Sequence, residues 1–89
     1  RTSKLQIVYD KSGNIDKSET EMFIESENDI LALENLLKVF CKSQSTDEFI
    51  SAVRKQLDGK SANAKLTLDN GQLLRLGTSG GYTEVHTSR

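Results

Sequence analysis

Leucines alternate with other residues on both sides of Asp69-Asn70-Gly71, in the second half of the chain. Alternation with a period of two is typical of strands with one buried face, so these segments predict an antiparallel hairpin. A two-residue turn at Asn70-Gly71 would divide the leucines between both faces. A three-residue loop closed by Gly71 in the left-handed region instead sets Leu66 opposite Leu74 and gathers the leucines on one face. We therefore predict a buried face of Leu66, Leu68, Leu74 and Leu76, with Leu73 more exposed.

The N-terminal residues predict a second hairpin. The segment Leu5–Tyr9 is apolar at every second position, and Asp10-Lys11-Ser12-Gly13 has the Asp and Gly of a type I turn. The return strand starts with Ile15. Because residues 16–19 offer no apolar partner, a bulge or a short break is expected near Lys17-Ser18.

Two amphipathic helices are predicted between the hairpins. Ser26-Glu27-Asn28-Asp29 and Ser45-Thr46-Asp47-Glu48 each place a hydroxyl at a candidate N-cap and a carboxylate three residues later, which is the pattern of a capping box. Gly59 is placed to end the second helix as its C′ residue. Apolar stripes at helical spacing follow the two boxes: Ile30, Leu33, Leu36, Leu37 and Phe40, then Phe49, Ile50, Val53 and Leu57.

The C-terminal segment Tyr82–Thr87 is rich in strand formers and follows Gly80-Gly81. We predict that it forms a last strand at an edge of the sheet, where its open backbone groups could pair with a second copy in a homodimer or with a strand-adding partner. The elements together predict an α+β fold in which residues 1–89 form a single small domain. Its order is β-β-α-α-β-β-(β), with an antiparallel sheet of four to five strands and two helices packed on one face.

Composition limits the class of protein. The 89 residues are 35% hydrophobic and 28% charged, which predicts a globular domain with one modest core. One cysteine cannot form an internal disulfide, which is typical of reducing compartments. No segment approaches the ~18 consecutive apolar residues of a membrane helix. We therefore predict an intracellular, cytoplasmic protein without a membrane span.

Candidate catalytic and ligand-binding motifs are weak, so we predict no enzymatic activity, no metal site and no cofactor. Cys41 and His86 are the only cysteine and histidine, and the predicted helix C-terminus near Cys41 disfavours a thiolate. One residue of each type cannot supply the four ligands of a structural zinc site. The segment Gly77–Gly81 resembles a phosphate-binding loop in composition only, because a strand and not a helix follows it.

Acidic residues are concentrated in one section of the chain. Residues 15–35 contain seven acidic residues and one basic residue, although the net charge of the chain is only −1. If the apolar residues of the second strand point inward, its outer face holds Phe23 among carboxylates. An apolar anchor with a charged rim is typical of a recognition patch, although the same residues could form an ordinary solvated face. The candidate contact residues are Glu19, Glu21, Phe23 and Glu25.

This pattern predicts a non-catalytic protein-interaction module, such as a small regulator, inhibitor or assembly factor, whose partner has a basic surface. The alternative is a nucleic-acid-binding regulator that uses Arg54 and Lys55 of the second helix and Arg75 of the C-terminal hairpin. Two observations disfavour the alternative. The chain is slightly acidic, and Arg54 and Lys55 lie toward the C-terminal half of their helix and not at the end that reads bases.

Overall fold

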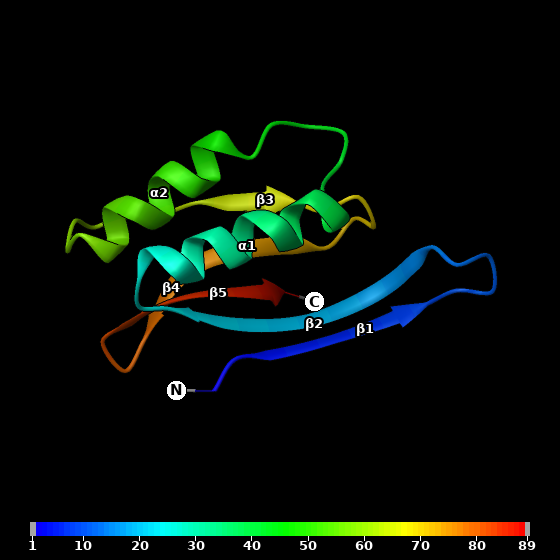
Figure 1. The fold of residues 1–89 in the computed structure, drawn as a ribbon, viewed down its shortest axis with the longest axis horizontal. Coiled ribbons are helices and arrows are strands. Elements are labelled where there is room, and N and C mark those ends of the chain that lie inside the picture. The colour runs from blue at the N-terminus through cyan, green and yellow to red at the C-terminus, as the bar shows by residue number, and fades with distance from the viewer. Residues whose placement is uncertain (1, 89) are drawn as a thin grey trace.

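The computed structural model describes residues 2–88, and its helices and strands follow the predicted order (Figure 1). The elements are β1 (Lys4–Tyr9), β2 (Ile15–Ile24), α1 (Glu27–Phe40), α2 (Asp47–Leu57), β3 (Lys65–Thr67), β4 (Leu73–Ser79) and β5 (Tyr82–Ser88). The five strands form one antiparallel sheet in the order β1-β2-β5-β4-β3, and both helices pack on one of its faces. The predicted α+β fold class is confirmed.

Strand β5 lies at the centre of the sheet and not at its edge. Val85 pairs with Met22 of β2 on one side and with Leu76 of β4 on the other. The predicted edge position of Tyr82–Thr87, and with it the homodimer through that edge, is therefore wrong. The physical reason is that one inserted strand satisfies the backbone groups of both hairpins and places the side chain of Val85, which is 0% exposed, in the core.

The core lies between the helices and the inner face of the sheet, as we call the face that they cover. Both helical stripes supply it as predicted, with Leu36 and Leu57 only partly buried. Its members on the helices are Ile30, Leu33, Leu37, Phe40, Phe49, Ile50 and Val53, and those on the strands are Met22, Ile24, Leu66, Leu74, Leu76 and Val85; Cys41, just after α1, and Leu68, just after β3, complete it.

The hairpin of β3 and β4 has the predicted register. Leu66 is opposite Leu74, and the N–H of Leu68 donates to the carbonyl oxygen of Gln72 at 2.8 Å. Gly71 has a φ of 88°, the left-handed conformation that closes the three-residue loop. The four predicted leucines are buried and Leu73 is half-buried, so the predicted division of the leucines is confirmed.

The helices begin close to the predicted positions, but the capping-box hydrogen bonds are not formed. Ser26 is the N-cap of α1 without a side-chain bond, and Asp29 Oδ2 accepts from the N–H of Glu25 at 2.8 Å. Asp29 is one methylene shorter than the glutamate of a typical box, and its oxygen meets the preceding N–H instead. Helix α2 begins one residue later than predicted, with Thr46 as its N-cap, so Glu48 is no longer in the third position.

The end of α2 agrees with the prediction. Gly59 has a φ of 85°, and its N–H donates to the carbonyl oxygen of Gln56 at 3.1 Å. The N–H of Lys60 donates to the carbonyl oxygen of Lys55 at 2.9 Å, which completes a Schellman motif.

Strands β1 and β2 form a long ribbon along one side of the molecule (Figure 1). Val8 pairs with Lys17 and Tyr9 pairs with Ile15, which leaves Asp16 as the extra residue of a bulge close to the predicted place. The side chains of β1 are largely exposed, since the helices lie over the other strands.

Side chains replace part of the backbone ladder between β2 and its neighbours. Backbone pairing of β2 with β5 covers only residues 21–24. Beyond it, Gln72 Oε1 accepts from the N–H of Ser18 at 2.7 Å, and Gln72 Nε2 donates to the carbonyl oxygen of Ser18 at 3.0 Å. Thr87 Oγ1 accepts from the N–H of Thr20 at 3.0 Å. The side-chain amide of Gln72 thus makes the paired bonds that a neighbouring strand would make.

Candidate functional site

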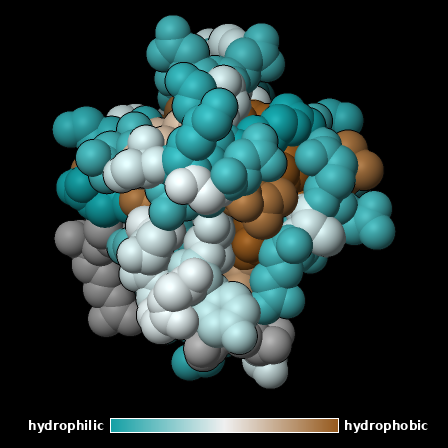
Figure 2. Space-filling model, turned by 90° about the vertical axis from the view of Figure 1, so that its left-hand side faces the viewer, coloured by the Kyte–Doolittle hydropathy of each residue, from teal (hydrophilic) through white to brown (hydrophobic). Residues whose placement is uncertain are grey.

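The outer face of the sheet, opposite the helices, is the first candidate site. Both helices lie on the inner face, so no helix or strand of residues 2–88 covers the outer one. Figure 2 views the molecule from the left-hand end of Figure 1; at this end hydrophilic residues dominate, and apolar residues show between them near the centre.

Strand β2 places three of the four predicted contact residues on the outer face. Glu19, Glu21 and Phe23 alternate with buried residues of β2, and Glu25 follows the end of the strand and is exposed. Phe23 is half-buried, whereas the sequence predicted an exposed ring. The reason is that β5 places Tyr82 beside it, with ring centroids 6.4 Å apart and an edge-to-face angle of 81°.

Neighbouring strands bring basic side chains next to the acidic ones. Glu21 pairs with Lys4 of β1 and with His86 of β5, and His86 pairs in turn with Arg75 of β4. These four residues form one row across the outer face. The face therefore carries both signs of charge, whereas the count along the chain predicted an acidic surface.

Glu84 is a member of the outer face that the sequence analysis missed. It pairs with Phe23 and with Gly77, and only 7% of the residue is exposed. Its Oε1 lies 2.9 Å from His86 Nδ1, a buried ring nitrogen to which no described residue makes a hydrogen bond. No signal in the sequence could have identified Glu84, because its burial follows from the central position of β5.

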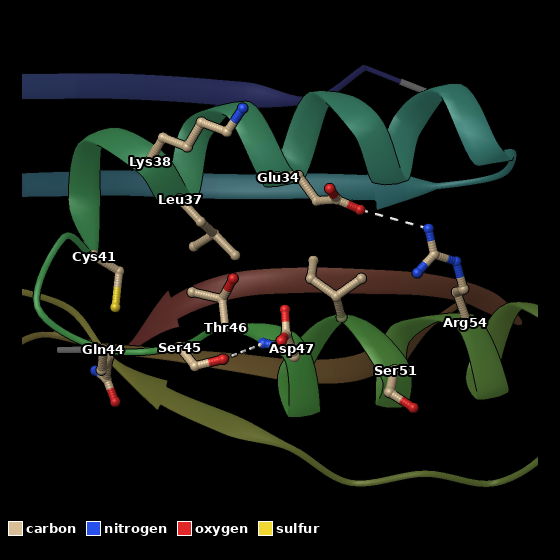
Figure 3. Close-up of a pocket in the computed structure, with 11 residues that line it drawn as sticks. Glu34, Leu37, Lys38, Cys41, Gln44, Ser45, Thr46, Asp47, Ser51 and Arg54 are labelled. Atoms are coloured by element: carbon tan, nitrogen blue, oxygen red, sulfur yellow. Dashed lines mark hydrogen bonds and ion pairs between the residues drawn. The ribbon is translucent and has the colours of Figure 1, made fainter.

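The second candidate site is a hollow between the two helices (Figure 3). It has a volume of about 700 Å³ and a floor of Leu37, Cys41 and Ile50. Arg54 and Glu34 face each other across it, with Arg54 Nη2 3.5 Å from Glu34 Oε1. The remaining lining residues are Lys38, Gln44, Ser45, Thr46, Asp47 and Ser51.

The residues of the nucleic-acid alternative do not form one surface. Arg54 Nη2 lies 2.6 Å from Glu27 Oε1, so two carboxylates of α1 engage its guanidinium. Lys55 is exposed on α2, and Arg75 lies on the opposite side of the sheet. The sheet therefore separates Arg75 from Arg54 and Lys55.

The structure also separates the two residues of the thiol–imidazole pair. Cys41 is buried at the end of α1, and its Sγ donates to the carbonyl oxygen of Thr67 at 3.7 Å. His86 lies on the outer face, so the sheet stands between them. Residues 2–88 contain no group of three or more His, Cys, Asp or Glu side chains placed to hold a metal ion. In the same part of the chain, no helix has the length and apolar character that crossing a membrane requires.

We expect the Arg54→Met variant to raise the pKa of Glu27. The hydrogen bond from Arg54 holds the pKa of Glu27 below its ordinary value of 4.5. A carboxylate with a lowered pKa favours the folded state above its unfolded pKa, and this contribution is lost as the pH falls through the folded pKa. An NMR titration of the Glu27 carboxyl measures the change. Lys55→Met is the control, because it removes a neighbouring charge that does not contact Glu27, and an equal rise there would contradict the assignment.

Comparisons with known proteins return no relative: no protein-family model, curated protein or solved structure matches this chain. Any functional proposal for it therefore depends on the fold and on the two candidate sites.

Proposed function

We propose that this chain is a non-catalytic protein-interaction module that binds another protein through the outer face of its sheet. The observation that supports the proposal is an uncovered sheet face holding an aromatic pair, Phe23 and Tyr82, beside three carboxylates. Aromatic side chains dominate the binding energy of many interfaces, and charged rims orient the partner.

In this proposal the aromatic pair is the anchor. Tyr82 is 40% exposed and Phe23 is half-buried, so a partner can cover both rings without moving the backbone. Glu19, Glu21 and Glu25 form the rim and select basic groups on the partner. Lys4, beside Glu21, adds a charge of opposite sign that fixes the orientation.

A small regulator, inhibitor or assembly factor is the kind of protein that such a domain suits, since it acts by binding alone. One cysteine, buried and free of disulfides, is compatible with a reducing compartment such as the cytoplasm. The regulatory role and the reducing compartment both belong to the proposal.

The Phe23→Ala variant is expected to lose at least about tenfold in affinity for the partner, because hot-spot residues cost ~2 kcal/mol or more when truncated. The partner is identified by cross-linking and capture from the source cells, and the affinity is then measured with the purified pair. Circular dichroism and thermal unfolding show whether the variant keeps its fold.

Two matched charge-reversal variants distinguish a specific effect of the outer face on binding from a general effect of net charge. Glu21→Lys with Glu25→Lys should abolish binding of the partner, whereas Glu48→Lys with Asp58→Lys makes the same change in net charge at exposed residues of α2 and its C-cap and should not. Equal loss in both double variants contradicts the proposal.

Nucleic-acid binding predicts the opposite sign for the same variant. Reversing Glu21 and Glu25 would then strengthen binding by removing repulsion from phosphate, and Arg54→Ala with Lys55→Ala would weaken it. Titration of labelled DNA and RNA at low salt is the first measurement. We expect no binding at tens of micromolar protein.

A further inference from the structure

The hydrogen bonds of β2 establish which backbone groups of β1 are open. The N–H groups of Ser18 and Thr20 point away from β1, toward the side of Gln72 and Thr87. In an antiparallel pair, successive residues direct their backbone groups to opposite sides. The residues of β2 on either side of Ser18 and Thr20 therefore direct their backbone groups toward β1.

The β1 partners of those residues of β2 are Lys4, Gln6 and Val8. The alternating residues Leu5, Ile7 and Tyr9 consequently direct their N–H and C=O groups to the free edge of the sheet. Strand β1 is the last in the strand order, so no other strand of residues 2–88 occupies this edge.

The same three residues expose apolar side chains on the inner face. Leu5 pairs with Thr20 and Ile7 with Ser18, both inward-facing residues of β2. Leu5 and Tyr9 are 49% and 57% exposed, and Ile7 between them is partly buried against the core. Open backbone groups thus coincide on one strand with an apolar row whose two outer members are exposed. The opposite edge, β3, has three residues and carries Lys65, and short charged strands protect an edge against pairing.

We propose that β1 binds a second copy of this chain, with the two β1 strands antiparallel about a two-fold axis at Ile7. This register sets Ile7 opposite Ile7 of the second copy and Leu5 opposite its Tyr9. Every outward N–H and C=O of the three residues then gains a partner, and the two apolar rows cover each other.

Charge and apolar character together favour this register and this partner. The register sets Gln6 opposite Val8 of the second copy and Lys4 opposite its Asp10, whose Oδ1 accepts from the N–H groups of Ser12 and Asn14 in the turn that follows β1. A shift by one residue would turn the apolar row away from its counterpart, and a shift by two would leave Leu5 or Tyr9 without an apolar neighbour. The segment from Lys4 to Asp10 is therefore complementary to itself in charge and in apolar character.

The oligomeric state is the first test. Light scattering at a protein concentration on the order of 100 µM should give a mass near twice the 9.9 kDa of the chain. A monomer mass at that concentration overturns the proposal. Ile7→Lys should return the protein to the monomer mass, because it places two like charges on the axis. Gln6→Lys adds the same charge to the same strand, opposite Glu19, and should leave the dimer intact.

Cysteine cross-linking tests the register without depending on a destabilising variant. Ile7→Cys should give a disulfide-linked dimer on mild oxidation, since residues on the axis have Cα atoms about 5.5 Å apart in a hydrogen-bonded pair. Leu5→Cys should not, because each copy's Leu5 then faces Tyr9. The wild-type chain, with its buried Cys41, measures the background. Cross-linking of Leu5→Cys in preference to Ile7→Cys overturns the register.

This dimer is independent of the proposed function, because it uses the edge of the sheet and leaves the outer face open. If the Ile7→Lys variant loses the dimer but still binds the Phe23-dependent partner, dimerisation and partner binding are independent properties. A chain that stays monomeric yet still requires Phe23 for its partner refutes the dimer alone.

Discussion

Replacing Leu66 by alanine is expected to lower the free energy of unfolding by about 2–5 kcal/mol, the range for a large-to-small change in a core. Leu66 is 7% exposed and lies opposite Leu74 on the inner face of the sheet. For so small a domain, that loss is a large fraction of the total stability of roughly 5–15 kcal/mol. Urea unfolding followed by circular dichroism gives the value, and an unchanged m-value shows that the unfolded state is comparable.

Leu73→Ala is the matched control for this prediction. It removes the same atoms from the neighbouring strand of the same hairpin, but Leu73 is half-buried on the outer face. We expect a cost well below that of Leu66→Ala. Equal costs for the two variants would mean that the hairpin has the other register, with a two-residue turn.

The Gln72→Ala variant should destabilise the domain by about 2–3 kcal/mol, even though Gln72 is only partly buried. Its amide bonds both the N–H and the carbonyl oxygen of Ser18, at 2.7 and 3.0 Å. A buried group that loses its partner costs about 1–3 kcal/mol, and the carbonyl oxygen of Ser18 keeps a longer bond from Thr87 Oγ1 at 3.4 Å, so the total stays close to the range for one group. Removing this one side chain therefore has the effect of removing a rung of the sheet.

Hydrogen exchange distinguishes this effect from a general loss of packing. In Gln72→Ala the amide of Ser18 should exchange faster relative to the amides of β4 and β5, because only its own partner is removed. Gln6→Ala, an exposed change on β1, should alter stability by no more than about 0.5 kcal/mol. Unchanged exchange at Ser18 would contradict the bridging role of Gln72.

The parts of the fold that the sequence predicts are those that local patterns determine. The turn at Gly71 and the apolar spacing around it give the register of the β3–β4 hairpin, and Gly59 gives the end of α2. The place of β5 could not be predicted in this way. Its pairing with β2 joins residues as distant as Met22 and Val85, and no pattern within either segment encodes that contact.

The candidate site shows the same division. Alternation along β2 correctly put Glu19, Glu21 and Phe23 on one face, since that is a property of the strand alone. The half-burial of Phe23 and the basic neighbours of Glu21 depend on which strands lie beside β2, so charge counted along the chain overstated the acidity of the surface.

The central position of β5 also has a consequence for how the chain acquires its structure. The sheet requires contacts between segments far apart in sequence, and a high contact order slows folding. During synthesis on the ribosome, β2 and β4 each present an unfilled edge until β5 has been made. In that interval the nascent chain is open to mispairing and aggregation through these two edges. Completion of the sheet is therefore a late event that joins the two hairpins into one cooperative unit.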